Sequence, residues 1–420
     1  MKFDTVIIGG GLSGLIAGIS LAEAGRSVAI ITAGQSSLHF NSGSFDLLGN
    51  CNGELVTSPI EAISSLPASH PYSRVGVERI QALLPAVQPL LGRAGIATTG
   101  GYTRNRYRLT PLGKIKPTWL SLEDIATFDN PTRLPWRRVA IVNLAGFLDF
   151  YPQFIYAGLT ALGVSCSVHS TTIPALDTLR KNPTEMRAAN IARVLDAEAI
   201  GVLAGRLNSV SRDADVIVMP AVVGLNDDLN LRLLRRLVAR PVYFVSTMPT
   251  SVPGVRTQIS LDRYFMKLGG TYMLGDTVIS GNFNGNRLES VTTRNHDSEP
   301  IEASNFIMAT GSFIGHGLKA TPDSIIEPTM GLDIDAPHDR SLWFKKNIDD
   351  NQPFMSFGVK TDNNLHPFKE GTLIENLYAC GSLLGGCNPV KEECGAGVSI
   401  LTALAVAHNI QSQFSTNRHD

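Results

Sequence analysis

A glycine-rich turn near the N-terminus constrains the fold of this chain more than any other feature of its sequence. The β-branched run 5–8 predicts a buried strand, and the turn that follows it at 9–14 (GGGLSG) fits the pattern G-x-G-x-x-G. An apolar stretch over 15–24 predicts a helix, and residues 27–31 predict a second strand. This order of strand, glycine turn, helix and strand is typical of a nucleotide-binding βαβ unit.

Each glycine of this turn has a physical role in such a unit. Gly9 allows the tight turn, Gly11 lets the backbone approach a pyrophosphate, and Gly14 lets the helix lie close to the strand. The N-terminus of the helix then offers N–H groups and a partial positive charge to a phosphate. We therefore expect a nucleotide at this turn.

The end of the second strand departs from the usual pattern. A dinucleotide site normally has Asp or Glu there, to bind the adenosine ribose, but this sequence has Thr32-Ala33-Gly34. The ligand is then a mononucleotide, or a dinucleotide held in another way, with Thr32 as the candidate contact.

Composition narrows the possible functions. The chain has 420 residues, of which 43% are hydrophobic and 17% charged, and its formal net charge is −1. This balance argues against a nucleic-acid-binding protein, which usually has a basic excess. The low charge suggests that a partner covers part of the surface. Asp4 and the glycines within the apolar N-terminus argue against a signal peptide, and no other run reaches the roughly 20 apolar residues of a membrane helix.

Two later segments separate a flavin from a nicotinamide. Residues 305–308 predict a strand that runs into an Ala-Thr-Gly turn, and 375–380 predict a strand that runs into Gly-Ser, before a glycine-rich start to an apolar helix. These segments resemble the second and third fingerprints of the two-dinucleotide-binding flavoproteins. In that superfamily the last helix directs its N-terminus at the flavin, where it stabilises the anionic reduced ring. The resemblance implies flavin contacts from Ala309, Thr310, Gly311, Gly381, Ser382, Gly395 and Gly397, although Ser382 replaces the usual aspartate.

The positions of these fingerprints at opposite ends of the chain predict a divided domain. We expect an α/β protein in which a Rossmann-like flavin-binding domain, made of 1–75 and 255–420, is split by an inserted α/β domain over 76–254. The insert shows its own alternation of apolar strands and helices, and we assign it to the substrate or to a partner.

The loop after the second strand is a further candidate for flavin contacts. It is rich in Ser and Gly, and in fumarate-reductase-like flavoproteins a loop of this kind lies against the flavin, which makes Ser42, Gly43 and Ser44 candidate contacts. His39 is a candidate for covalent flavin attachment, although a polar loop histidine is the simpler interpretation.

Two basic clusters are candidates for binding an anion. Arg104, Arg106 and Arg108 alternate, so a strand places them on one face. There they either bind an anion, which is a substrate phosphate, a flavin phosphate or an acidic partner, or simply protect a solvated edge strand. Arg187 follows a possible helix start at Thr184, and it either lines the substrate domain or belongs to a surface ion-pair face.

Three cysteines near the C-terminus are spaced by seven residues. Cys380, Cys387 and Cys394 lack the close pairs of zinc and iron–sulfur sites, so the spacing predicts no metal site. A redox disulfide linked to the flavin remains open, but small buried residues are the more common outcome.

Several segments together resemble one family nearly end to end. They are FDTVIIGGGLSGL, SSLHFNSGSFDLL, RLTPLGKIKPTWL, NPTEMRAANIARVLD, GLDI and LYACGSLLGG, and they resemble the B subunits of anaerobic glycerol-3-phosphate dehydrogenases. The resemblance implies oxidation of sn-glycerol 3-phosphate to dihydroxyacetone phosphate, with electrons passed to the quinone pool in fumarate or nitrate respiration. It also implies an FAD-containing A subunit, an iron–sulfur membrane-anchor C subunit, and a cytoplasmic location at the inner face of the membrane.

The resemblance describes the B subunit as carrying FMN, which agrees with the missing acid at Thr32, while the intact glycine pattern leaves FAD open. Three functions remain: a subunit that oxidises the substrate, an electron-relay or structural subunit, and a stand-alone flavin dehydrogenase. The sequence lacks a clear His–Arg catalytic constellation, which favours the relay and leaves the catalytic residues unassigned.

Overall fold

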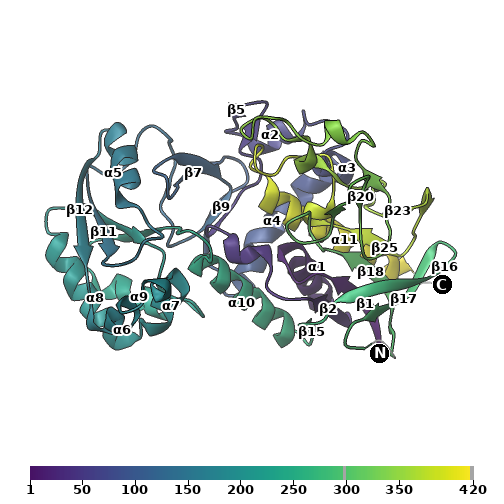
Figure 1. Ribbon diagram of the computed structural model, residues 1–420, viewed down its shortest axis with the longest axis horizontal. Coiled ribbons are helices and arrows are strands. Elements are labelled where there is room, and N and C mark those ends of the chain that lie inside the picture. Colours follow the sequence, from purple (N-terminus) through teal and green to yellow (C-terminus); the bar gives the residue numbers. More distant parts are fainter. Residues whose placement is uncertain (297–298, 417–420) are drawn as a thin grey trace. The chain divides into compact units, whose positions relative to one another are not determined.

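The computed structural model describes residues 1–296 and 299–416, and its chain divides into two compact units (Figure 1). Unit 1 comprises 1–37, 46–94 and 261–420, and unit 2 comprises 38–45 and 95–260. Both units contain a largely parallel sheet with helices. The expected α/β class is therefore confirmed.

The central sheet of unit 1 joins the two ends of the chain. Its strands follow the order β15-β2-β1-β18-β17-β16, and β25 pairs with β18. All of these pairings are parallel except those of β16 with β17 and of β17 with β18. The strands are β1 (Lys2–Ile8), β2 (Val28–Thr32), β15 (Thr271–Leu274), β16 (Val278–Asn284), β17 (Arg287–Thr293), β18 (Ile301–Met308) and β25 (Leu377–Ala379).

Apolar strands at the centre of this sheet are buried along their length. All five residues of β2 are buried, as are the last four of β1 and of β18. Near-continuous apolar runs are what parallel strands covered on both faces require. Short antiparallel strand pairs complete the unit: β4 (Asn50–Cys51) with β5 (Glu54–Leu55), β19 (Lys319–Ala320) with β20 (Ile325–Ile326), β21 (Ile334–Asp335) with β22 (Gly358–Val359), and β23 (Phe368–Lys369) with β24 (Thr372–Leu373).

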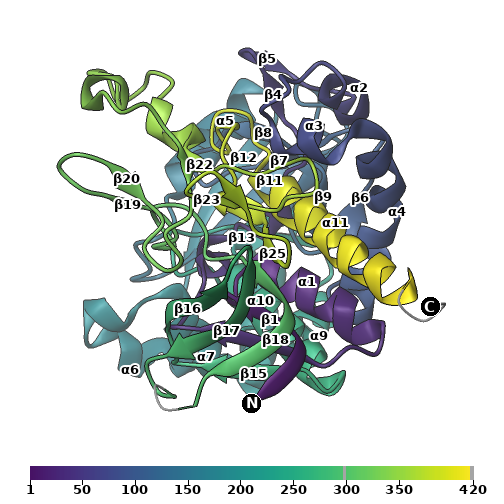
Figure 2. The ribbon, with the colours of Figure 1, turned by 90° about the vertical axis from the view of Figure 1, so that its right-hand side faces the viewer.

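Helices from distant parts of the sequence pack together in unit 1. Helix α1 (Leu12–Glu23) contacts the C-terminal helix α11 (Gly395–Thr416), and the two lie side by side in Figures 1 and 2. Helices α3 (Pro71–Val75) and α4 (Val77–Arg93) contact α11 as well, and α2 (Pro59–Ile63) precedes them.

The boundary at which the chain enters the long segment of unit 2, at 95–260, differs from the predicted limit at residues 75 and 76. The sequence placed α4 in the insert, but α4 belongs to unit 1, where Arg79 donates hydrogen bonds to Ala405 O (2.7 Å) and Asn409 Oδ1 (2.6 Å) of α11. The amphipathic pattern of α4 shows that one face is buried, but it does not say against which partner. The boundary at which the chain returns from the segment 95–260 to unit 1 lies inside α10 (Val252–Lys267), between residues 260 and 261.

Unit 2 is built on a four-stranded parallel sheet in the order β12-β11-β13-β14. The strands are β11 (Arg138–Leu144), β12 (Ser165–Thr171), β13 (Val216–Pro220) and β14 (Val242–Val245). Its helices are α5 (Pro152–Ala161), α6 (Asp177–Arg180), α7 (Ala188–Val194), α8 (Ala197–Val210) and α9 (Leu229–Leu237). Two small antiparallel sheets complete it, from β3 (Ser44–Phe45), β9 (Leu120–Leu122) and β6 (Thr98–Gly100), and from β10 (Thr127–Phe128), β7 (Arg106–Leu109) and β8 (Ile115–Thr118).

Candidate functional site

The three predicted flavin fingerprints meet at one edge of the unit 1 sheet. Strands β1, β18 and β25 are parallel neighbours, so the turns that follow them leave the sheet at the same side. Backbone hydrogen bonds connect them: Ala309 N–H donates to Ile8 O (2.8 Å), and Cys380 N–H donates to Met308 O (3.0 Å). The carboxyl edge of a parallel sheet is where open α/β folds bind ligands.

The first fingerprint is shaped by close backbone contacts. Gly9 has φ +114°, and a Cβ there would lie 2.3 Å from Ala309 O. A Cβ on Gly14 would lie 1.9 Å from Gly9 O, whereas a Cβ on Gly11 would meet only Ser36 Cβ, at 3.7 Å. Gly9 and Gly14 are therefore required by the turn itself, while Gly11 borders open space.

Helix α1 presents its N-terminus at this open space. It begins after Gly11, and among the described residues no side chain forms a capping hydrogen bond to its first turn. The first N–H groups of a helix have no partner within the helix and carry a partial positive charge. This end of α1 therefore suits a phosphate.

Gly14 gives a direct test of the turn geometry. We expect Gly14→Ala to destabilise the protein by about 1–3 kcal/mol, because the added methyl group has to displace the Gly9 carbonyl. Thermal unfolding measures the loss. Gly92→Ala in α4 is the matched control, since a Cβ there meets nothing within 4 Å and removing a helical glycine stabilises by roughly 0.5–1 kcal/mol. Equal stability of the two variants would contradict the geometry.

The second fingerprint contributes an unsatisfied hydroxyl. Thr310 Oγ1 is buried and has no hydrogen-bond partner among the described residues, and the neighbouring Gly311 has φ +80°. Buried hydroxyl groups in proteins are normally hydrogen-bonded. A polar group of a bound ligand would satisfy this one, as expected for a flavin at this turn.

The third fingerprint lies against α1. Gly381 has φ +72°, its N–H donates to Thr402 Oγ1 (2.9 Å), and a Cβ there would lie 2.0 Å from Ser13 Oγ. Gly397 is equally crowded, because its N–H donates to Asp46 O (2.7 Å) and a Cβ would lie 2.2 Å from the Tyr72 hydroxyl. These contacts explain both glycines by packing, and a flavin contact by Gly397 stays a prediction.

A pocket lies between the second and third fingerprints. Its volume, including the space open to solvent, is about 560 Å³, and Ser382 and Gly395 line it. The remaining lining is mostly apolar, with Phe313, Phe354 and Leu384 among it. An apolar lining with a few polar groups is typical of cofactor sites. The unsatisfied Thr310 hydroxyl, the open space at Gly11 and this apolar pocket together fit a flavin.

Thr32 takes the place of the usual ribose-binding acid. Its side chain is buried, and its hydroxyl donates to Gly34 O at 3.2 Å. The structure therefore gives Thr32 a role in closing the turn after β2, and a contact with the cofactor stays a prediction.

The serine-rich loop belongs to unit 2. Gly43 has φ +82°, and Ser42 Oγ and Ser44 Oγ share a hydrogen bond of 2.7 Å. His39 is half-buried, burial lowers its pKa, and its Nδ1 has no hydrogen-bond partner among the described residues. The flavin contacts predicted for this loop stay predictions.

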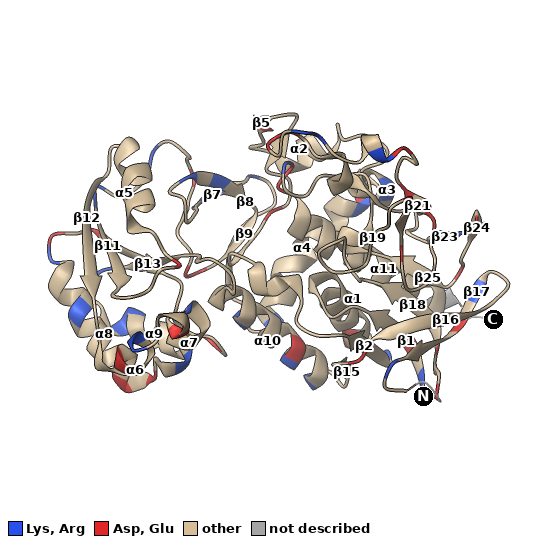
Figure 3. Ribbon diagram, in the orientation of Figure 1, with Lys and Arg blue, Asp and Glu red and all other residues tan. Residues whose placement is uncertain are grey.

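The arginine cluster is only partly built as expected. Arg106 and Arg108 share one face of β7, and the ribbon of β7 is partly blue in Figure 3. Arg104 precedes the strand and is exposed. Arg106 pairs with Asp129 (Nε to Oδ1, 3.0 Å), whereas Arg108 Nε is buried without a hydrogen-bond partner in the described part of the chain. Arg108 alone therefore keeps the prediction of an anion site open.

Arg187 belongs to a surface ion pair. It donates to Asp149 at 2.8 Å, and 60% of its side chain is exposed. The predicted helix start at Thr184 was wrong, because α7 begins at Ala188, and residues 183–185 form a short 3-10 turn capped by the Asn182 side chain. These contacts favour the surface interpretation, and substrate binding by Arg187 stays a prediction.

Several residues that shape the pocket were not predicted from the sequence. The rings of Phe313 and Phe354 meet edge to face with centroids 6.2 Å apart, and Cys387 also lines the pocket. Phe313 carries a weak sequence signal, because it lies two residues after the Ala-Thr-Gly turn. Phe354 carries none, because a short 3-10 turn (Pro353–Ser356) brings it in from a distant loop.

Known proteins resemble this chain over nearly its whole length. The family described as FAD binding domain matches residues 4–398. A protein named as the B subunit of anaerobic glycerol-3-phosphate dehydrogenase, from Yersinia pestis, is 43% identical over 99% of this chain and 99% of its own. Proteins of the same name from Pectobacterium carotovorum and Vibrio cholerae are 40% and 37% identical, covering 98% and 100% of this chain and 99% and 98% of their own.

Solved structures are more distant. A 3-ketosteroid delta1-dehydrogenase from Sterolibacterium denitrificans is 10% identical, covers 98% of this chain and 100% of its own, and has a TM-score of 0.46. A quinol fumarate reductase from E. coli, also 10% identical, covers 99% of this chain and 71% of its own, with a TM-score of 0.45. The sequence matches are decisive: this chain belongs to the FAD-binding domain family and, within it, to the B subunits of anaerobic glycerol-3-phosphate dehydrogenases.

Proposed function

We propose that this chain is the flavin-binding B subunit of a complex that oxidises glycerol 3-phosphate to dihydroxyacetone phosphate and passes the electrons to quinone. The observation that carries the proposal is the meeting of all three flavin fingerprints at one sheet edge, in a chain that matches B subunits end to end. A bound flavin supplies two-electron chemistry. The N-terminus of α1 would hold its phosphates, and the N-terminus of α11 would favour the negative charge of its reduced form.

The lining of the pocket supports an electron-relay role for this chain. None of the residues that line it, within the described part of the chain, carries a charge. Glycerol 3-phosphate carries a doubly charged phosphate, for which Arg and Lys are the usual charged partners, and the α11 N-terminus at this pocket is assigned to the flavin. We therefore propose that the substrate is oxidised on the FAD-containing A subunit, and that the flavin of this chain relays the electrons.

FAD is the flavin that we propose. FMN was predicted from the missing acid after β2, but the matching family is described as an FAD binding domain, and the glycine turn has the geometry that a pyrophosphate requires. We expect stoichiometric FAD when the purified chain is denatured with acid and the released cofactor is identified by its mass. Release of FMN alone would restore the original prediction, and colour retained in the protein pellet would indicate covalent attachment.

Partner proteins would connect this chain to the membrane. Within the described residues, no helix has both the length and the apolar character needed to span a bilayer. The relatives are named as subunits, so we propose an iron–sulfur membrane-anchor C subunit as the partner that receives the electrons, with the complex on the cytoplasmic face of the membrane.

Reconstitution tests this assignment. We expect the isolated chain to show little glycerol-3-phosphate-dependent dye reduction, because its pocket offers no cation to the substrate phosphate. The A and C subunits together should catalyse quinone reduction slowly or not at all, and addition of this chain should restore it. Full activity from this chain alone would identify a stand-alone dehydrogenase, and no effect of its addition would contradict the relay.

A further inference from the structure

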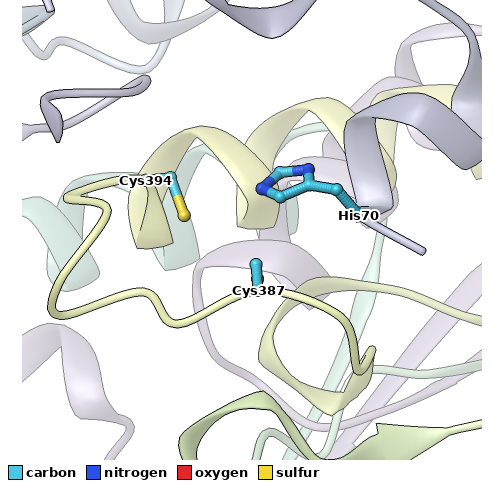
Figure 4. A group of neighbouring side chains, drawn as sticks. All are labelled: His70, Cys387 and Cys394. Atoms are coloured by element: carbon cyan, nitrogen blue, oxygen red, sulfur yellow. The ribbon is translucent and has the colours of Figure 1, made fainter. Parts of the chain in front are cut away.

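A buried cluster of His70, Cys387 and Cys394 lies in unit 1 and is not explained by flavin binding. One nitrogen of His70 and the two cysteine sulfurs lie within 4.8 Å of one another, and all three residues are buried. Figure 4 shows the imidazole of His70 directed toward Cys394, with Cys387 below them. The cluster combines a loop, the segment after β25 and the start of α11. Cys387 also lines the pocket assigned to the flavin.

Glu392 adds a carboxylate to this cluster. Its Oε2 lies 3.2 Å from His70 Nε2 and 4.0 Å from Cys394 Sγ, close enough to accept the thiol proton. The Glu392 side chain is 26% exposed, whereas that of His70 is 1% exposed. Glu392 therefore connects the buried thiols to solvent.

The cluster has the residue types of a metal site, but the protonation of His70 argues against one. The backbone N–H of Tyr72 donates to His70 Nδ1 at 3.0 Å, so Nδ1 is the acceptor nitrogen and the neutral ring has its proton on Nε2. A metal ion at Nε2 would need the lone pair that this proton occupies, and metal-bound histidines normally donate from their other nitrogen. His70 therefore presents an N–H donor to the sulfurs.

This donor lacks an aligned acceptor. Although Glu392 Oε2 is near, His70 Nε2 forms no hydrogen bond of acceptable geometry with any described residue. A buried N–H group without an acceptor is destabilising, and a negatively charged sulfur beside it would remove that cost. The arrangement thus suits a thiolate that forms during a reaction.

We propose that Cys387 and Cys394 are a redox pair that forms a reversible disulfide beside the flavin. In this step the two S–H bonds break and one S–S bond forms. The flavin of the neighbouring pocket is the oxidant and takes two electrons and one proton, and Glu392 takes the other proton. His70 Nε2–H stabilises the Cys394 thiolate, which bonds to the Cys387 sulfur as the two electrons and the proton of the Cys387 S–H bond leave for the flavin. The flavin as oxidant rests on the function proposed above.

The environment of Cys394 explains why the step needs these groups. A hydrogen bond with Cys387, burial and the nearby carboxylates of Glu392 and Asp46 raise the pKa of the Cys394 thiol well above its usual value. The Cys394 thiol is therefore protonated near neutral pH, and the thiolate, which is the reactive form, requires a base. The two sulfurs lie within 4.8 Å of each other, so the side chains must move closer to reach the S–S length of about 2.05 Å.

Trypsin offers a clean test, because Lys391 separates the two cysteines. The full chain is equilibrated in buffers of oxidised and reduced dithiothreitol, its free thiols are alkylated under denaturing conditions, and the digest is analysed by mass. We expect the peptides on either side of Lys391 to be joined after oxidation and separate after reduction. Cys387→Ser should abolish the joined species. Cys380→Ala is the matched control, because Cys380 lies on the same peptide as Cys387 and its loss should leave the joined species unchanged.

Two further measurements separate this proposal from others. Anaerobic reductive titration should consume two more electrons per wild-type chain than per Cys387→Ser chain. Glu392→Gln should slow disulfide formation at least tenfold and change its pH dependence. Free thiols under every condition would overturn the proposal, as would one zinc per chain that is lost in Cys387→Ser. A chain that forms the disulfide but contains no flavin would refute the proposed flavin function and leave the redox pair standing.

Discussion

Replacing Gly11 with glutamate is expected to remove the flavin from the purified protein while leaving its fold intact. Gly11 borders open space, since a Cβ there meets only Ser36 Cβ at 3.7 Å, so a longer side chain extends away from the protein. It would then occupy the space in front of the α1 N-terminus, where the phosphates of the flavin would bind. Its carboxylate would also compete for the same N–H groups and repel the phosphates. We expect at least a hundredfold weaker flavin binding.

Flavin absorbance per chain and far-UV circular dichroism measure the two parts of this prediction. Gly11→Ala is the control for the site, because its small side chain fits without displacing protein atoms and should retain most of the flavin. Gly14→Ala is the contrasting variant, in which stability falls. A folded Gly11→Glu protein with its full flavin content would show that the phosphates bind elsewhere.

Removing Asp124 is expected to cause the largest loss of stability in unit 2. Asp124 Oδ2 accepts from Arg256 Nη2 at 2.8 Å, and the two side chains are 7% and 9% exposed. Arg256 also donates through Nη1 to Gly224 O (2.8 Å) and Val223 O (3.2 Å), so one guanidinium joins three segments of the unit. Asp124→Ala leaves this cation buried without its anion, which costs about 3–5 kcal/mol.

Thermal unfolding should show this loss as a fall in Tm of roughly 10 °C for a domain of this size. Arg232→Ala is the control, because Arg232 pairs with Asp228 on the surface and its side chain is 63% exposed. Exposed pairs contribute about 0–1 kcal/mol. If the two variants lost similar stability, the Asp124–Arg256 pair would be no more important than a surface pair.

Much of the fold follows from local patterns in the sequence. The β-branched run before Gly9 forms β1, the apolar stretch after Gly14 forms α1, and the insert contains the alternating strands and helices that its apolar runs predicted. Strand and helix periods depend only on neighbouring residues, and a glycine turn fixes its own backbone. The identity of the family was also readable, because its motifs are contiguous segments.

The limits of the units and the cluster beside the pocket depended on tertiary structure. Helix α4 joins unit 1 because Arg79 reaches α11 from more than 300 residues away in the sequence. His70 is likewise more than 300 residues away in the sequence from Cys387 and Cys394. The spacing of seven residues between the two cysteines predicts no site by itself. The proton on His70 Nε2 is decided by one backbone N–H, that of Tyr72. Local sequence patterns determined what each segment becomes, and long-range packing decided which side chains meet and in which chemical state.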